Sequence, residues 1–159
     1  MNTASERTRD RRLARVLLAD TGLATRLTLK SILSTAGYSV SGVATAAEAR
    51  GKLDTGEYQL VLADLRAESE EAGPQVLAYA RQKEFRPATA LLASELASDL
   101  SATGSQALES GARRSVHISQ ENISSFLSGV AELIGRRADR RMMSQMMRMM
   151  SAFAKATVN

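Results

Sequence analysis

The chain has 159 residues, of which 44% are hydrophobic, and this suits one domain with a buried core and a modest extension. It has no cysteine, a single histidine (His117) and no apolar run near the roughly 20 residues of a membrane span, so disulfides, thiolate or multi-histidine metal sites and a membrane helix are excluded. The net charge of +4 is uneven, because residues 1–15 carry +3, residues 136–159 carry +5, and the stretch between them is left with −4.

The first part of the chain predicts a basic tail followed by a strand and a helix. Residues 1–13 are polar and arginine-rich without periodicity, which predicts a disordered N-terminus. Residues 15–19 (RVLLA) form a short apolar run that fits a strand buried on both faces. Residues 23–36 are predicted as a helix that Gly37 ends, with apolar side chains at helical spacing at Leu29, Ile32, Leu33 and Ala36.

The same alternation continues through the middle of the chain. Residues 38–43 and 58–63 are predicted strands, and between them Thr45 and Glu48 make a capping box that opens a short helix ending at Leu53. Residues 74–85 are a predicted helix with Pro74 in its first turn. Two more strands follow at residues 88–93 and 114–118, with a weaker helix at 96–110, and Ser119 is the predicted N-cap of a last helix.

Five repeats of strand and helix predict a parallel sheet with helices on both faces. In such folds ligand sites collect at the carboxyl ends of the strands. Asp20 and Thr21 follow the first strand, Asp64 follows the third, and Ala93 and Ser94 follow the fourth. Two carboxylates are therefore expected at one edge. No glycine-rich phosphate loop follows any strand, which argues against nucleotide binding.

The segments RVLLADTGLATRLTLKSILSTAGY and GEYQLVLADLR resemble the first and third strand regions of response-regulator receiver domains, over roughly residues 15–135. The resemblance implies a flavodoxin-like, doubly wound, five-stranded parallel sheet, (βα)5, at residues 14–135. It also implies that Asp64 accepts a phosphoryl group from a partner histidine kinase. Mg²⁺ would be held by Asp20, Asp64 and the backbone carbonyl of Arg66. A non-enzymatic protein of two-component signalling and phosphorelay is expected.

The chain departs from the family at several positions. Thr21 replaces the second acid after strand one. Leu92 stands where a threonine or serine is usual, although a shift of the alignment by two positions would place Ser94 there. Ile118 replaces the lysine after strand five, and Ser115 replaces the aromatic residue of the switch. The loss of a carboxylate and a cation predicts weak Mg²⁺ binding and a small response to phosphorylation. His117 or Arg113 could replace the lysine. The acidic loop of Glu68, Glu70 and Glu71 could supply a metal ligand or simply be solvated.

The last helix is predicted to run from Ser119 to about Lys155, roughly 50 Å. Its first part would pack on the sheet, through Ile123, Phe126, Leu127, Val130, Leu133 and Ile134. Residues 136–159 form an arginine- and methionine-rich extension. We call its apolar side chains the methionine stripe: Met142, Met143, Met146, Met147, Met149, Met150 and Phe153. Such a stripe needs cover, from a second copy in a homodimer, from its own domain or a partner's groove, or from an anionic membrane surface.

Two functions remain open from the sequence. The first is an atypical single-domain receiver that acts through protein–protein contacts, with Asp64 as phospho-acceptor. The second is a phosphorylation-independent pseudo-receiver that serves as a dimerisation or scaffold module through its C-terminal helix. Nucleic-acid binding through the basic ends is disfavoured, because 24 residues after the receiver are too few for a DNA-binding domain. With no apolar N-terminal segment to act as a secretory signal, a cytoplasmic location is expected.

Overall fold

The computed structural model describes residues 13–94, 115–118 and 123–158. Within them, five strands form one parallel sheet in the order β2-β1-β3-β4-β5, which is the flavodoxin-like order. The strands are β1 (Arg15–Asp20), β2 (Ser39–Val43), β3 (Leu60–Asp64), β4 (Ala88–Ser94) and β5 (Ser115–Ile118). The predicted parallel sheet is confirmed.

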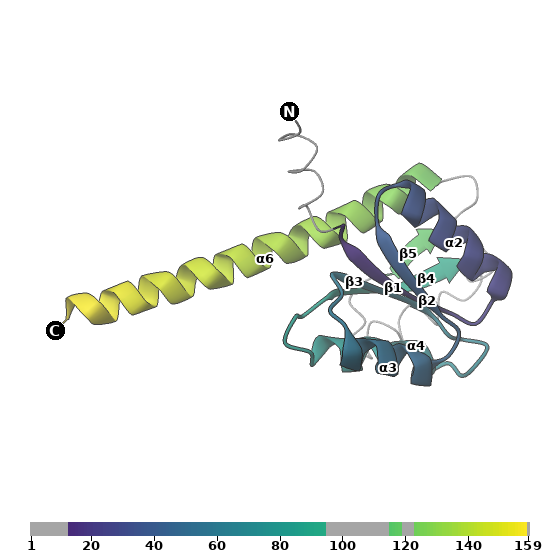
Figure 1. The fold of residues 1–159 in the computed structure, drawn as a ribbon, viewed down its shortest axis with the longest axis horizontal. Helices are drawn as coiled ribbons and strands as arrows, with labels where there is room; N and C mark the ends of the chain where they lie inside the picture. Colours follow the sequence, from purple (N-terminus) through teal and green to yellow (C-terminus); the bar gives the residue numbers. More distant parts are fainter. Residues whose placement is uncertain (1–12, 95–114, 119–122, 159) are drawn as a thin grey trace, which may run out of the picture.

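Helices cover both faces of this sheet (Figure 1). On one face lie α3 (Ala46–Thr55) and α4 (Ala72–Arg81), and on the other lie α2 (Leu23–Thr35) and α6 (Ile123–Thr157). Because side chains alternate along a strand, β1 sends Leu17 and Ala19 into one core cluster and Val16 and Leu18 into the other. This explains why the strands read as continuous apolar runs in the sequence.

The predicted capping signals are confirmed in part, and α3 ends at Thr55 rather than at Leu53. The hydroxyl of Thr45, the N-cap of α3, accepts a hydrogen bond from Glu48 N at 3.2 Å, while the Glu48 carboxylate accepts one from Ala44 N at 3.4 Å rather than from Thr45. After α2, Gly37 adopts φ +100°, a conformation that only glycine enters without strain.

Several predicted boundaries and contacts were wrong. The helix predicted at residues 74–85 runs from Ala72 to Arg81, because turns take over after its last buried residue, Ala80. The third strand starts at Leu60 rather than at residue 58. Ala36 is exposed just past the end of α2, and Ile123 at the start of α6 is 44% exposed, so neither belongs to the core. The predicted helix at 96–110, Ser119 and nearly all of the predicted N-terminal tail lie outside the described residues.

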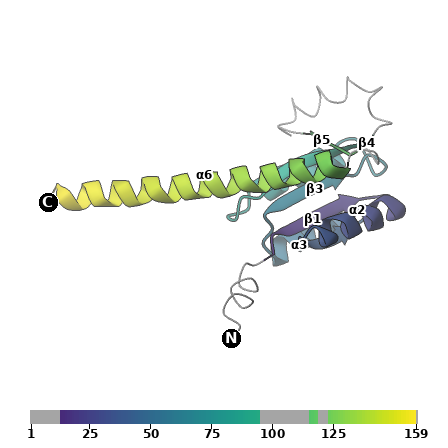
Figure 2. The same ribbon diagram turned by 90° about the horizontal axis from the view of Figure 1, so that it is seen from above.

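Helix α6 continues well beyond the domain. It is one helix of 35 residues, about 50 Å long, and neither Gly129 nor Gly135 interrupts it. Its last buried residue is Arg137, and every residue from Ala138 to Val158 is exposed. Figure 2 shows this part projecting away from the sheet.

No helix among the described residues combines the length and the apolar character that crossing a membrane requires. The boundary between residues 135 and 136 stays a prediction.

Arg137 anchors the helix where it leaves the domain. Its guanidinium donates to the backbone oxygens of Phe85 (2.7 Å) and Arg86 (3.1 Å), in the loop before β4. Arg86 has φ +39°, an unfavourable conformation for a side-chain-bearing residue, so Arg137 holds a strained turn. Burial lowers the pKa of Arg137 from its usual value. The two hydrogen bonds compensate for part of that desolvation.

We expect Arg137→Ala to lower the free energy of unfolding by about 2 kcal/mol, because two carbonyls lose a charged donor and one of these bonds is buried. Urea denaturation followed by circular dichroism measures this. Arg140→Ala, an exposed neighbour on the same helix, is the matched control and should change stability by less than about 0.5 kcal/mol. Equal stability of the two variants would show that Arg137 does not anchor α6.

Candidate functional site

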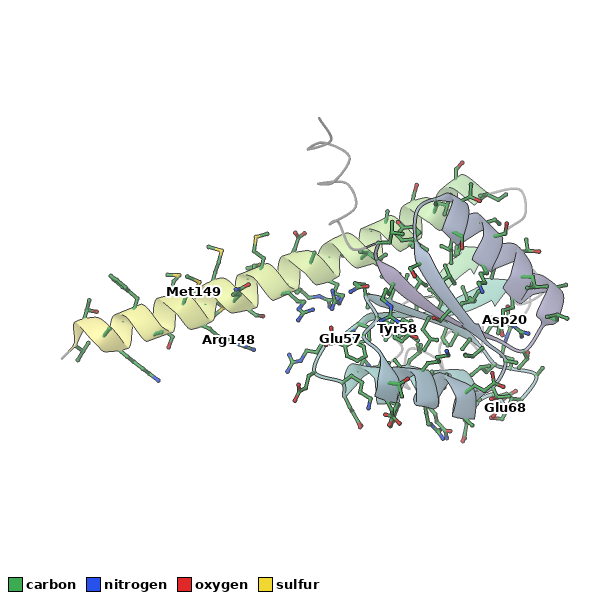
Figure 3. All side chains as sticks on the ribbon, in the orientation of Figure 1. Asp20, Glu57, Tyr58, Glu68, Arg148 and Met149 are labelled. Carbon is green, nitrogen blue, oxygen red and sulfur yellow. The ribbon has the colours of Figure 1, made fainter. Side chains whose placement is uncertain are left out.

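Asp20 and Asp64 are brought together by the sheet. Asp20 ends β1, Asp64 ends β3, and the two are direct partners in the parallel register. The backbone also links the two strand ends, since Thr21 N donates to Asp64 O at 3.3 Å. In Figure 3 Asp20 is labelled at the end of the domain opposite to the projecting helix. The predicted convergence of two carboxylates at the carboxyl edge is thus present.

Asp20 is the buried member of the pair, with only 4% of its surface exposed. Its Oδ1 accepts a hydrogen bond from Gly22 N at 2.8 Å, and its Oδ2 is buried without a hydrogen-bond partner. Burial raises the pKa of Asp20, and the negative charge of Asp64 raises it further, against the lowering effect of the Gly22 hydrogen bond. An orphaned buried carboxylate oxygen beside a second carboxylate is an arrangement that a cation would stabilise.

Asp64 is the accessible member, with 20% of its side chain exposed, and it already pairs with a cation. The guanidinium of Arg66 donates through Nε to Oδ1 at 3.0 Å and through Nη2 to Oδ2 at 3.1 Å. This bidentate pair raises the pKa of Arg66. The sequence reading gave Arg66 only a backbone role and missed its side chain. An arginine two positions after the acid makes such a pair possible, but the conformation of the loop after β3 decides whether it forms.

The other predicted site residues differ in how far the structure describes them. Thr21 is half-buried, and its hydroxyl makes no hydrogen bond with the carboxylate of Asp20 or Asp64. Leu92 is buried in the core cluster beneath α2 and α6, where it can offer no hydrogen bond. Arg113 and the side chains of Ser94, Ser115, His117 and Ile118 lie outside the described residues, so their predicted roles stay predictions.

The oxygen atoms at the carboxyl edge of the sheet fit the ligand requirements of Mg²⁺ only in part. Mg²⁺ in proteins is held by one or two carboxylates together with several waters, which matches Asp20, Asp64 and the Arg66 carbonyl. The orphaned Oδ2 of Asp20 is the observation that favours a cation here. Among the described residues no group of three or more acidic, histidine or cysteine side chains could hold a metal, and Arg66 competes for Asp64. The residues present therefore fit a weak site.

One of the three glutamates in the loop after β3 makes a hydrogen bond to the backbone of α3. Glu68 is labelled below Asp20 in Figure 3, and its carboxylate accepts a hydrogen bond from Ala46 N at 2.9 Å, at the first turn of α3. Glu70 and Glu71 are exposed. Glu68 thus caps a helix, where the sequence reading considered a replacement metal ligand.

We expect Asp20→Asn to stabilise the protein at neutral pH in the presence of a chelator. A carboxyl whose pKa is raised on folding contributes stability that is present below its unfolded value, near 3.8, and is lost as the pH rises through the folded pKa. Asparagine keeps an acceptor for Gly22 N and removes the buried charge. Stability should rise by about 1 kcal/mol at pH 7 and vary less between pH 4 and 7. Thermal melts across this range measure it, and a less stable variant at pH 7 would contradict it.

The fold is similar to that of several solved receiver domains. It is similar to a CheY-like response regulator receiver domain protein from Methanospirillum hungatei (23% identity, 80% of this chain, 98% of that chain, TM-score 0.66). It is also similar to a response regulator receiver protein from Sinorhizobium medicae (23% identity, 79% of this chain, 97% of that chain, TM-score 0.64).

A third similar structure is NtrX from Brucella abortus in complex with ADP (16% identity, TM-score 0.72), where 84% of this chain matches 30% of the longer protein. No model of a known protein family matches the sequence, and no curated protein matches it either. The chain has the receiver-domain fold, with at most 23% sequence identity to these three structures.

Proposed function

We propose that this chain is a signalling protein of two-component type, an atypical single-domain receiver that acts through protein–protein contacts, with Asp64 as its phospho-acceptor. The observation that supports it is the register pairing of Asp20 and Asp64 at the carboxyl edge of the sheet, with a buried carboxylate oxygen left unpaired. A structural acid would be expected to have its oxygens paired. The partners would be a histidine kinase or another signalling protein, and a second copy bound through α6.

In the proposed reaction an oxygen of Asp64 attacks the phosphorus of a phosphohistidine or acyl phosphate, and the donor group leaves with the bonding electrons. Asp64 can do this because it is partly exposed, whereas Asp20 is buried. Arg66 must first release the attacking oxygen, and its guanidinium can then pair with phosphoryl oxygens. Bound Mg²⁺, held by Asp20, Asp64 and the Arg66 carbonyl, would neutralise charge that develops on the phosphoryl group.

A pseudo-receiver is the second candidate, and the Asp64–Arg66 ion pair favours it. A carboxylate that is neutralised on both oxygens is a poor nucleophile and a poor metal ligand. Thr21 and Leu92 add no group that would help transfer. In this candidate the domain is a binding module and the methionine stripe drives assembly. A cytoplasmic location stays a prediction under both candidates.

Incubation with acetyl phosphate and Mg²⁺, followed by intact-mass measurement, tests the proposal. We expect the mass of one phosphoryl group to be added to the wild type and to Asp139→Ala, an acid remote from the site, and to be absent from Asp64→Ala. If the wild type gains no mass, phospho-acceptance is refuted. An oligomer that is unchanged in Asp64→Ala would then support the pseudo-receiver.

A further inference from the structure

The methionine stripe is left bare by the described part of the chain. Its seven side chains lie on the projecting part of α6 and are between 55% and 72% exposed. The largest apolar patches of monomeric proteins are usually interaction sites. The stripe therefore needs a partner, and its direction on the helix restricts what that partner can be.

The stripe points away from the domain that carries it. Residues that α6 buries, from Phe126 to Arg137, share one face of the helix. Arg148 and Lys155 continue that face, because they follow Arg137 by about three and five whole turns. At about 100° per residue, the middle of the stripe falls on nearly the opposite side. In Figure 3 Met149 and Arg148 point to different sides of the ribbon. Without a break in α6, the stripe cannot close onto its own domain.

A second copy matches the stripe in size and shape. The projecting residues 138–157 span about 30 Å of helix. If each of the seven side chains loses on the order of 100 Å², one helix buries about 700 Å², close to the roughly 800 Å² per partner of a standard interface. A second copy offers the same length of helix and the same stripe, with Arg148 and Lys155 facing outward on both sides.

Charge distinguishes the two orientations of such a pair. Asp139, Met146 and Phe153 are seven residues apart and share a face, so a parallel pair would set Asp139 against Asp139 of the second copy. An antiparallel pair instead sets Asp139 of each copy beside the last turns of the other helix, which carry Lys155 and no acid.

We propose that two copies pair through their methionine stripes with the helices antiparallel, so that Met142 of one copy lies beside Phe153 of the other. Met146 and Met149 of the two copies then meet at the centre, and the two domains lie at opposite ends. This pairing rests on the homodimer in the proposed function and adds its orientation.

Engineered cysteines test the orientation, because the chain has none of its own. Met142→Cys and Phe153→Cys are made separately, and one is given a size tag. In an antiparallel pair identical residues at these ends are 11 positions apart along the axis, about 16 Å, which exceeds the roughly 7 Å limit between the Cα atoms of a disulfide. Neither variant alone should form a linked dimer under mild oxidation. The two co-expressed variants should form a linked heterodimer.

Ser144→Cys is the matched control, since Ser144 is exposed on the same stretch but faces away from the stripe. It should not link in any combination. Self-linking of both Met142→Cys and Phe153→Cys would overturn the antiparallel orientation and leave the homodimer intact. Absence of a linked heterodimer, together with a monomeric wild type in sedimentation, would overturn both the orientation and the homodimer.

Discussion

Replacing Met146 and Met149 with glutamate is expected to convert the protein from a dimer to a monomer. In the antiparallel pair these two positions meet at the centre, so the double substitution would bring four carboxylates into one apolar interface. An unpaired charge in such an interface costs several kcal/mol, and each 1.4 kcal/mol weakens association tenfold. We expect the dimer to weaken by at least about 100-fold, and light scattering coupled to size-exclusion chromatography would report the halved mass.

The matched control places the same two charges on the opposite face. Ser144→Glu with Ser151→Glu adds glutamates to the same exposed stretch of α6 and should leave the dimer mass unchanged. Because residues after Arg137 are exposed, neither double variant should lower the thermal stability of the domain. A wild type that is monomeric at micromolar concentration, or equal masses for the two double variants, would contradict this role of the stripe.

The pair of Asp20 and Asp64 and the point where α6 leaves the domain lie at opposite edges of the sheet. Asp20 and Asp64 end parallel strands, so they mark the carboxyl edge. Helix α6 starts shortly after β5 ends and runs back across the sheet, and Arg137 reaches the loop that precedes β4, at the amino edge. Pairing through the stripe therefore leaves the carboxyl edge open to a kinase. It also allows assembly without phosphorylation, as the second candidate requires.

Much of the fold could be predicted because it depends on short-range patterns. The apolar run of Val16 to Ala19 identifies a doubly buried strand, and parallel strands must end at one edge, which places Asp20 beside Asp64.

The point where α6 leaves the domain could not be predicted in the same way, because it depends on how the helix packs against the sheet and the loop before β4. Arg137 sits in an arginine-rich run that looks solvated, and its burial was missed. Its spacing after Phe126, Val130 and Leu133, at four, three and four residues, was the usable signal.

The ion pair between Asp64 and Arg66 could not be predicted from the sequence. Arg66 follows Asp64 by two positions, and in an extended segment their side chains would share one face. Whether the guanidinium turns onto the carboxylate depends on the loop that follows β3, including the turn in which Glu68 N and Ser69 N donate to Leu65 O. That conformation depends on contacts with α3, through Glu68 and Ala46. No local pattern in the sequence encodes it.

Removing the Arg66 guanidinium is expected to strengthen Mg²⁺ binding about ten- to hundredfold. Arg66→Ala frees both oxygens of Asp64 and removes a positive charge from beside the metal position, while keeping the backbone carbonyl. Two unit charges 4 Å apart interact by about 4 kcal/mol at an effective dielectric constant of 20, and solvent screening at the partly exposed pair reduces this to the expected range. Isothermal titration with Mg²⁺ measures the change without any phosphodonor.

Two further variants separate charge from geometry. Arg66→Lys keeps the positive charge but cannot make the bidentate pair, so its Mg²⁺ affinity should fall between those of the wild type and Arg66→Ala. Asp64→Asn added to Arg66→Ala should remove the gain, because the freed carboxylate is then absent. If the arginine blocks the site, Arg66→Ala should also be phosphorylated faster than the wild type by acetyl phosphate. Equal Mg²⁺ affinities in the wild type and Arg66→Ala would show that the ion pair does not govern access to Asp64, and the weakness of the site would then be due to Thr21.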